Sequence, residues 1–298
     1  MRRMRFRAAA VAVLVAGALV ACGDAGDDEG NDAPEVEAAD DCDGKFEDGT
    51  QMAALSEAGE IAVGVRFDQP GLGQKDATAD VPEGFDVEMA KLLIADLCID
   101  PESDSVTWEE AISEQREQFL QEGRVDLVAA SYSITDERRQ LVGQTGPYML
   151  TGQQVLVPID SDVESIEDLK GEEVCAASGS TSLENVEAAG AVPVPADTYG
   201  QCAEDVVNGT VPAMSTDGTI LLGLAAQYEG DVHVVGPEFS EERIGIGYGL
   251  DYPEMCEWIN GVLTEAFEDG TWADAFEATL GGDDVETPEP PTLDECQA

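Results

Sequence analysis

The sequence predicts an α/β fold in two lobes, each with a mixed, mostly parallel sheet flanked by helices. From residue 60 onward, short runs rich in β-branched residues alternate with segments of helical period. This alternation is the pattern of strands joined by helical crossovers. About 240 residues are available for the fold, and a chain of that length favours two lobes over one.

Six short runs have the composition expected of strands. One of them contains His233, the only histidine of the chain, and reads as buried, so this histidine is expected to be structural. Apolar residues recur at i, i+4, i+7, i+8 and i+12 in one segment and predict a buried helical face. Further helices are expected at 217–227 and 255–267. The strand predictions are Ile61–Val65, Val125–Ala129, Gln154–Val157, Glu173–Ala176, Val211–Met214 and Val232–Val235, and the helical face consists of Phe85, Met89, Leu92, Leu93 and Leu97.

The amino terminus resembles a bacterial lipoprotein signal. Four arginines precede an apolar run at 8–20, which is shorter than the roughly 20 residues that a bilayer requires. The run ends in Leu19–Cys22, where leucine and small residues before a cysteine resemble a lipobox. We therefore expect residues 1–21 to be removed and Cys22 to be lipidated, with the mature protein on the outer face of the cell membrane. Ordinary secretion, with Cys22 as a bystander, is the alternative.

Acidic residues dominate the mature chain. Residues 23–49 carry twelve acidic side chains and one lysine, so residues 22–49 are expected to be a disordered tether. Removing the four leader arginines from fourteen cations leaves ten against 64 carboxylates, a formal charge of 10 − 64 = −54. Nucleic acid is therefore not an expected partner. Because salt screens the self-repulsion of such a surface, we expect a halophilic protein.

Six cysteines besides Cys22 remain in the mature chain. An even number in an exported protein suggests disulfides, although six cysteines allow fifteen pairings. They include no CxxC pair and only one histidine is present, so neither a metal nor another cofactor is expected. The six are Cys42, Cys98, Cys175, Cys202, Cys256 and Cys296.

Five segments in order along the chain resemble one protein family. Together they are similar to the family 3 extracellular solute-binding proteins of ABC importers, and most of all to the actinobacterial glutamate-binding lipoproteins. The likeness runs from about residue 52 to residue 282. The segments are Val65–Gly73, Gly84–Val87, Val125–Arg138, Gly146–Tyr148 and Ser178–Ser182.

The resemblance implies a periplasmic-binding-protein-like fold of type II, in which two lobes close on one amino acid. Residues 50–150 and 241–298 would form lobe one, and residues 151–240 would form lobe two. The protein would be a monomeric receptor and not an enzyme. Its partners would be the permease and ATPase subunits of an importer.

The same resemblance narrows the disulfides. Cys175 and Cys202 would both belong to lobe two, where we expect them to pair. The other four cysteines would lie in lobe one and leave three pairings open. Cys42–Cys98 together with Cys256–Cys296 is the simplest of these, because it staples both tails.

A bound amino acid needs donors for its carboxylate and an anion for its ammonium group. By the resemblance, Arg138 and Ser133 hold the α-carboxylate and Asp217 holds the ammonium group. Thr181 has capping-box spacing to Glu184 and would open a helix whose N–H groups give a second grip on a carboxylate. On the residues alone, Arg138 would be a solvated arginine, and Thr181 and Asp217 would be helix caps.

The other end of the predicted site indicates an acidic ligand, L-glutamate or L-aspartate. Arg66 ends the first strand, and Arg116 closes a serine-x-x-arginine segment that resembles that of aspartate/glutamate receptors. Two arginines that converge repel each other, and an acidic ligand explains both. Ion pairs with Asp68 or Glu114 are the structural alternative. The residues expected here are Arg66, Ser113, Arg116, Ser131 and Tyr199.

Two other functions stay open. Cyclohexadienyl or arogenate dehydratases resemble these receptors, but no residue here demands a general acid and the lipobox favours a tethered receptor. A ligand-sensing lipoprotein without an importer would bind in the same way. Since one methylene changes pocket fit by only about 1–3 kcal/mol, the sequence does not rank glutamate against aspartate, and it does not show how glutamine is discriminated.

Overall fold

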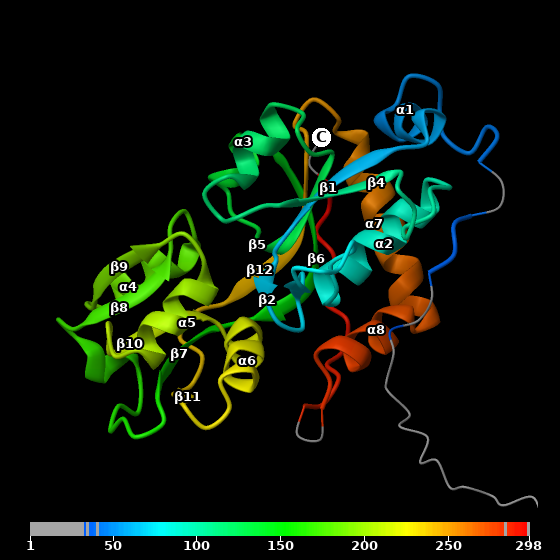
Figure 1. Cartoon of the computed structure of the whole chain (residues 1–298). Coiled ribbons are helices and arrows are strands. Elements are labelled where there is room, and N and C mark those ends of the chain that lie inside the picture. The colour runs from blue at the N-terminus through cyan, green and yellow to red at the C-terminus, as the bar shows by residue number, and fades with distance from the viewer. Residues whose placement is uncertain (1–32, 34–35, 40–41, 283–284, 297–298) are drawn as a thin grey trace, which may run out of the picture. The chain divides into compact units, whose positions relative to one another are not determined.

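A computed structural model describes residues 33, 36–39, 42–282 and 285–296. The predicted signal peptide and Cys22 lie outside the described residues. Within the described ranges, no helix is long and apolar enough to cross a membrane. The structure confirms the predicted α/β class, with two separate five-stranded sheets (Figure 1).

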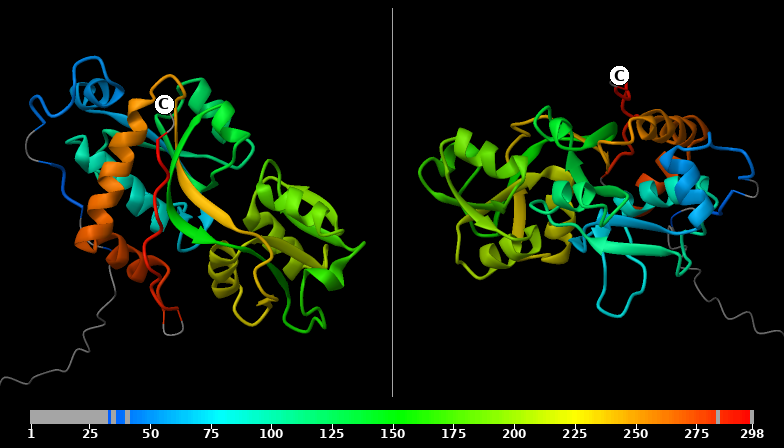
Figure 2. Two further views of the ribbon diagram at one scale, coloured as in Figure 1. Left: turned by 180° about the vertical axis from the view of Figure 1, so that it is seen from behind. Right: turned by 90° about the horizontal axis from the view of Figure 1, so that it is seen from above.

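The first lobe is built on a sheet of order β4-β1-β5-β12-β6. Helices α2, α7 and α8 pack against one another beside it (Figure 2), and a two-stranded hairpin, β2 and β3, precedes α2. The strands are β1 (Ile61–Val65), β2 (Asp68–Gln69), β3 (Gly73–Gln74), β4 (Val106–Glu110), β5 (Leu127–Ser133), β6 (Gly143–Thr151) and β12 (Glu242–Tyr248). The helices are α1 (Gln51–Ala58), α2 (Phe85–Asp96), α3 (Arg116–Gln121), η1 (Arg138–Gln140), α7 (Glu254–Asp269) and α8 (Thr271–Thr279).

The second lobe is built on a sheet of order β11-β7-β10-β8-β9. Its strands are β7 (Gln153–Pro158), β8 (Glu173–Ala177), β9 (Val192–Ala196), β10 (Ala213–Asp217) and β11 (Val232–Val235). Its helices are η2 (Ile166–Leu169), α4 (Thr181–Ala188), α5 (Tyr199–Val207) and α6 (Gly218–Gln227). The chain passes from β6 into β7 at Gly152 and returns from β11 to β12 through residues 236–241.

Both sheets are mixed and mostly parallel, as predicted: in each, four of the five strands run in the same direction and one strand, β12 in the first sheet and β7 in the second, runs against them. In the first sheet, β1 pairs in parallel with β4 and β5, whereas β12 is antiparallel to both of its neighbours. In the second, β8 is parallel to β9 and β10, and β7 is antiparallel to β10 and β11. The antiparallel pairs arise where the chain changes lobes, because β6 and β12 each lead directly into or out of a crossover without an intervening helix.

Two strands extend further toward their carboxyl ends than the sequence indicated. β5 reaches Ser133, which pairs with Ile244 of β12, and β10 reaches Asp217, which pairs with Gln153 of β7. The polar residues at these ends show no alternation of apolar and polar side chains, so the predicted strands ended too early, at Ala129 and Met214. The cross-strand pairing nevertheless fixes Ser133 and Asp217 in regular backbone, whereas Ser131 lies at an irregularity of β5 and has a left-handed φ of +46°.

Part of the expected tether lies against the first lobe. The Lys45 side chain donates to the backbone and the carboxylate of Asp96, and the Phe46 ring packs edge-on against Trp258. Cys42 is bonded to Cys98. The expectation of a free tether up to residue 49 is therefore wrong for residues 42–49, because an aromatic anchor and a disulfide compensate for their acidity.

All three disulfides follow the simplest pairing. Cys175 of β8 is bonded to Cys202 of α5 inside the second lobe. Cys42–Cys98 and Cys256–Cys296 attach the two tails to the first lobe. The bond of Cys296 brings the C-terminal segment, drawn in red, alongside α7 and β6 (Figure 2).

Candidate functional site

The predicted ligand residues follow the carboxyl ends of strands in both sheets. Arg66 comes directly after β1, Ser133 ends β5, Thr181 follows β8 and Asp217 ends β10. In α/β folds, such strand ends are where ligands bind. Of the nine predicted residues, eight are buried and Thr181 is half-buried. The fold therefore gathers polar and charged groups that a soluble protein normally exposes.

All three nitrogens of the Arg138 guanidinium contact protein groups. Its Nη1 donates to Ser133 O at 2.7 Å and its Nη2 donates to Gly179 O at 3.0 Å, which lies in the second lobe. Its Nε lies 3.3 Å from a carboxylate oxygen of Glu117. The backbone N–H of Arg138 is capped by Thr135 Oγ1. These contacts fix the guanidinium at the junction of the lobes, which excludes the solvated-arginine alternative.

Gly179 makes this junction possible. Its φ is +72°, and a Cβ there would lie 2.8 Å from the Cα atom of Glu114 in the first lobe. Real Cβ contacts are never that short. Glycine therefore lets the β8–α4 loop approach both the Arg138 side chain and the loop that precedes Arg116.

Arg116 and Arg138 share one aromatic neighbour, Tyr132. Their guanidinium carbons lie 5.2 and 5.0 Å from the centre of its ring, within the range of cation–π attraction. The Tyr132 hydroxyl donates to Glu117 at 2.8 Å. Burial, reinforced by the charges of Arg66 and Arg138, lowers the pKa of Arg116 to about 10. Three arginines therefore lie close enough to repel one another.

Arg66 forms the ion pair that the structural alternative anticipated. Its Nε and Nη2 donate to one carboxylate oxygen of Asp68 at 2.8 and 2.6 Å. The other oxygen of Asp68 accepts from the backbone N–H of Gly200 at 2.9 Å, in the first turn of α5. Asp68 thus links Arg66 in the first lobe to a helix of the second. A cavity of about 370 Å³ opens beside this link.

Three donors around these arginines remain unsatisfied. Nη1 of Arg66, Nε of Arg116 and Oγ of Ser113 are buried and have no hydrogen-bond partner among the described residues. Leaving a buried donor unpaired typically costs about 1–3 kcal/mol, and more for a charged group. An anion is the kind of partner that such buried cationic and hydroxyl donors lack.

Asp217 brings a buried carboxyl group to the same site. Burial raises its pKa to about 8; the nearby Glu242 adds to the rise, and Arg116 and Arg138 oppose it. Its Oδ1 is buried without a hydrogen-bond partner among the described residues. Asp217 is the N-cap of α6 by position, but its side chain makes no capping bond. The simple helix-cap alternative is therefore wrong.

Thr181 is not the helix cap that its spacing suggested. Ser180 caps α4 instead, with its Oγ accepting from Leu183 N at 3.2 Å. The Thr181 hydroxyl lies 3.3 Å from Ser133 Oγ and donates to Glu242 at 3.2 Å. Because Ser180 takes over the capping bond, the Thr181 hydroxyl is directed to the junction of the lobes.

The hydroxyl groups of the two remaining predicted residues, Tyr199 and Ser131, both donate to protein groups. The Tyr199 hydroxyl donates to Ser182 at 3.0 Å, and burial together with the charge of Asp217 raises its pKa. Ser131 Oγ lies 2.8 Å from Gln69 Oε1 and 3.0 Å from Asp86 Oδ2. Because its one proton is used in these contacts, the Ser131 hydroxyl has no proton left to donate to a ligand.

Sequence reasoning missed several buried polar residues. Asp86 accepts from the backbone and hydroxyl of Ser131 and from the Tyr148 hydroxyl, and burial raises its pKa despite these bonds. Glu242 accepts from Thr181, Asn185 and Ser240. In a chain with 64 carboxylates, composition could not single these out. The segment Gly84–Val87 did contain Asp86, and a polar residue inside a buried helical face was the available signal.

A family model matches this arrangement. The model of the bacterial extracellular solute-binding proteins, family 3, covers residues 61–281. The chain belongs to this family. It is 39% identical over 248 residues to the glutamate-binding protein GluB of Corynebacterium glutamicum, covering 80% of this chain and 84% of that protein. It is 29% identical over 238 residues to the glutamine-binding protein GlnH of Bacillus subtilis, covering 79% and 86% of the two chains.

Solved structures agree with the two-lobed fold. An ancestral arginine-binding protein bound to glutamine superposes with a TM-score of 0.69 and 32% identity, covering 75% of this chain and 99% of that one. This family 3 protein is therefore an amino-acid-binding protein of the extracellular type. Proteins similar to it include ones named for binding glutamate, glutamine and arginine.

Proposed function

We propose that this protein captures an acidic amino acid, glutamate or aspartate, between its lobes and delivers it to the permease and ATPase subunits of an ABC importer. The observation that carries the proposal is a cluster of charges around Arg116, which feels the charges of Arg66 and Arg138 and lies within electrostatic reach of the buried Asp217. A ligand with two carboxylates and one ammonium group matches this set of charges. The similarity to GluB supports the same choice.

The α-amino-acid group would be held at the junction of the lobes. Three observations support this: Ser133 Oγ lies 3.3 Å from Thr181 Oγ1, Arg138 donates to Ser133 O, and Arg138 donates to Gly179 O of the second lobe. A carboxylate there would accept charge-assisted bonds from the N–H groups of Arg138 that its contacts with Ser133, Gly179 and Glu117 leave unused. Asp217 would pair with the ammonium group, whose charge favours the ionised carboxylate.

The distal carboxylate would be held by Arg66, Ser113 and Arg116. Each has a buried donor without a partner among the described residues. The pair with Asp68 occupies Nε and Nη2 of Arg66 and leaves Nη1 available. The ion pair and the ligand contact are therefore compatible, and Asp68 orients the guanidinium.

Calorimetric titration of the mature protein in molar salt tests this proposal. The ligands are glutamate, aspartate, glutamine and arginine. We expect glutamate or aspartate to bind more tightly than glutamine, because a neutral amide leaves one positive charge uncompensated at Arg66 and Arg116. Preference for glutamine or arginine would overturn the assignment of these two arginines. Binding of none of the four would remove the receptor proposal.

Export and anchoring form a separate part of the proposal. Cys22 would be lipidated, so that the receptor stays at the membrane beside its importer. Metabolic labelling with a palmitate analogue should mark the wild-type protein and leave Cys22→Ala unlabelled. Equal release of both proteins into the medium would indicate ordinary secretion.

The excess of 54 negative charges supports a protein that works in brine. Carboxylates repel one another over about 8 Å at physiological salt and over about 3 Å at 1 M. We expect unfolding on dialysis into dilute buffer and recovery when salt is restored, both followed by circular dichroism. A protein that stays folded in dilute buffer would contradict the halophilic assignment.

A further inference from the structure

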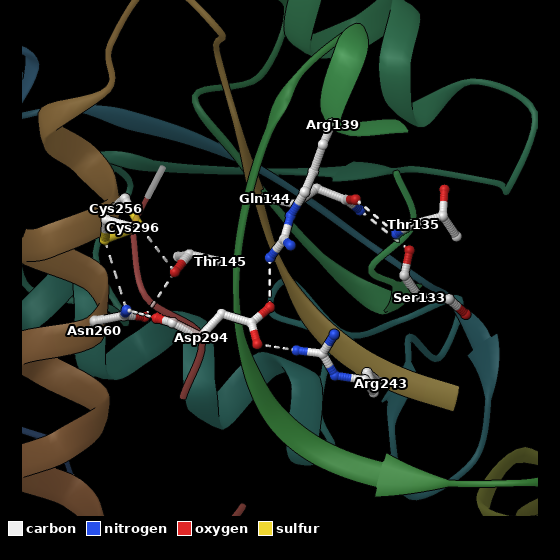
Figure 3. Close-up of polar contacts among 10 residues, drawn as sticks. All are labelled: Ser133, Thr135, Arg139, Gln144, Thr145, Arg243, Cys256, Asn260, Asp294 and Cys296. Atoms are coloured by element: carbon white, nitrogen blue, oxygen red, sulfur yellow. Dashed lines mark hydrogen bonds and ion pairs between the residues drawn. A yellow bond between two sulfur atoms is a disulfide. The ribbon is translucent and has the colours of Figure 1, made fainter. Parts of the chain in front are cut away.

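The C-terminal segment is attached to the first lobe at several points near its end. Cys296 is bonded to Cys256 of α7. Two residues before it, Asp294 donates its backbone N–H to Gly146 O and accepts from the Asn260 side chain at its own carbonyl oxygen. Figure 3 shows the disulfide and the contact between Asn260 and Asp294. The end of the chain is therefore held as firmly as an internal loop.

The Asp294 side chain joins two arginines that would otherwise repel each other. Arg139 Nη2 donates to one carboxylate oxygen at 2.6 Å, and Arg243 Nη2 donates to the other (Figure 3). Arg139 belongs to η1 and Arg243 belongs to β12. One carboxylate of the tail thus connects the end of the β5–η1 segment to its neighbouring strand.

The β5–η1 segment also contains Ser133 and Arg138, the residues predicted to bind the α-carboxylate. Ile134 donates its backbone N–H to Arg243 O at 2.7 Å, and Arg138 immediately precedes Arg139. From β6, the Gln144 amide donates to Ser133 O and accepts from Thr135 N, each at 3.2 Å. Residues 133–140 are therefore fixed by β12 and β6, and by the tail through Arg139.

We propose that the C-terminal segment 285–296, closed by the Cys256–Cys296 disulfide, is a strap that positions residues 133–140 for ligand binding, with Asp294 as the positioning residue. This inference rests on the proposed role of Arg138 and Ser133. Asp294 touches no predicted ligand residue; it acts by balancing Arg139 and Arg243. Without it, two adjacent guanidinium groups would push η1 away from β12, and Arg138 would move with η1.

The strap acts within one lobe. The hydrogen bonds and ion pairs of Asp294 are to Gly146 of β6, Asn260 of α7, Arg139 and Arg243, all in the first lobe. A groove of about 670 Å³ separates this segment from the crossover residues near Glu238. The strap therefore sets the geometry of the half-site formed by the first lobe and leaves the crossovers free to move.

The structure offers a matched control. Cys42–Cys98 staples the other tail to the same lobe with a sequence separation of 56 residues, compared with 40 for Cys256–Cys296. Stabilisation by a disulfide depends only weakly on loop length, so the two should contribute similarly to unfolding. Only Cys256–Cys296 is connected to residues 133–140.

The first test titrates four variants of the full mature chain with L-glutamate in molar salt. We expect Cys256→Ser with Cys296→Ser, and Asp294→Asn, to bind on the order of 5- to 20-fold more weakly than wild type. Asp294→Glu should recover most of that loss, because it keeps the charge. Cys42→Ser with Cys98→Ser should bind within about twofold of wild type, although its Tm falls comparably. Equal affinities for the two cysteine double variants would overturn the proposal.

The second test measures hydrogen exchange of the backbone amides of residues 134–142 without any amino acid. We expect exchange at least roughly tenfold faster in the Cys256/Cys296 double serine variant and unchanged exchange in the Cys42/Cys98 one. Unchanged exchange in both would refute the strap, even if wild type binds glutamate. If wild type binds none of the four amino acids, the proposed function fails and this measurement still decides whether the strap exists.

Discussion

The two ends of the candidate site differ in how completely the protein satisfies them. At the junction of the lobes, Arg138 already has partners in Ser133, Gly179 and Glu117. At the other end, Arg66 Nη1 and Arg116 Nε are buried and have no hydrogen-bond acceptor among the described residues. The first end is preorganised by the scaffold, as a contact shared by every amino acid requires. The second end depends on the ligand, as a contact that selects among amino acids requires.

The largest effect should come from the preorganised end. Arg138→Ala is expected to weaken binding of every amino acid that wild type binds by about 2–5 kcal/mol, because it removes one partner of a buried charge pair. Calorimetry with the same four ligands measures this. Arg124→Ala, which removes an exposed arginine paired with Glu109, is the control. Retained glutamate binding in Arg138→Ala would move the α-carboxylate elsewhere.

The ligand-dependent end should show selective losses. Arg66→Ala and Arg116→Ala are each expected to weaken glutamate binding by roughly 10- to 100-fold and glutamine binding much less, because only glutamate brings a charge to that end. The ratio of the two dissociation constants is the readout. Equal affinity of Arg66→Ala and wild type for glutamate would remove Arg66 from the pocket.

Asp217 connects binding to pH. Its pKa of about 8 in the structure means that the ligand-free protein holds a proton there at neutral pH, and a bound ammonium group would expel it. Glutamate binding should therefore release up to one proton and strengthen as pH rises toward 8, by at most about tenfold per pH unit. Titration in buffers of different ionisation enthalpy measures the release. No proton release at pH 7 would contradict the ammonium contact.

The same shift predicts a stability effect. An unfolded chain ionises Asp217 near its usual pKa of 3.8, whereas the folded chain keeps it protonated up to about pH 8. Folding stability contributed by this group therefore falls as pH rises from 4 to 8, by up to about 1.4 kcal/mol per unit. Asp217→Asn should match wild type at pH 4 and exceed it increasingly toward pH 8 in urea unfolding. A constant difference would show that Asp217 is solvated.

The smallest effect is expected at the link between the two lobes. Asp68→Asn keeps the shape but weakens the contacts with Arg66 and with the Gly200 N–H. We expect a roughly three- to tenfold loss of glutamate affinity, from losing one charge-assisted bond. Asp80→Asn, an exposed acid of the following loop, is the control. Tighter binding in Asp68→Asn would instead show that Asp68 competes with the ligand for Arg66.

The sequence could predict the elements more reliably than the ends of those elements. Apolar periodicity located β1, β11 and α2 almost to the residue. It stopped short of Ser133 and Asp217, because polar strand ends held by cross-strand pairing carry no hydrophobic pattern. It also chose Thr181 over Ser180 as the cap of α4, since both neighbours can accept the bond and only the backbone decides.

By composition alone, only the cations of the proposed site stand out; Asp217 was assigned through the family resemblance. Ten cations in the mature chain are few enough for Arg66, Arg116 and Arg138 to be conspicuous, whereas Asp86 and Glu242 are hidden among 64 acids. The pair of Arg66 with Asp68 was anticipated as an alternative to ligand binding. In the structure, Nε and Nη2 of Arg66 pair with Asp68, while Nη1 keeps no partner among the described residues and stays available for a ligand.

The position of the few positive charges limits which substitutions such a sequence can accept during evolution. Half of the ten mature cations lie in the site or beside the strap, as Arg66, Arg116, Arg138, Arg139 and Arg243. A lineage adapting to brine can replace exposed lysines by acids almost freely. At these five positions an acid would remove a proposed ligand contact or a contact of the proposed strap, so the arginines that persist through acidification should coincide with the binding machinery.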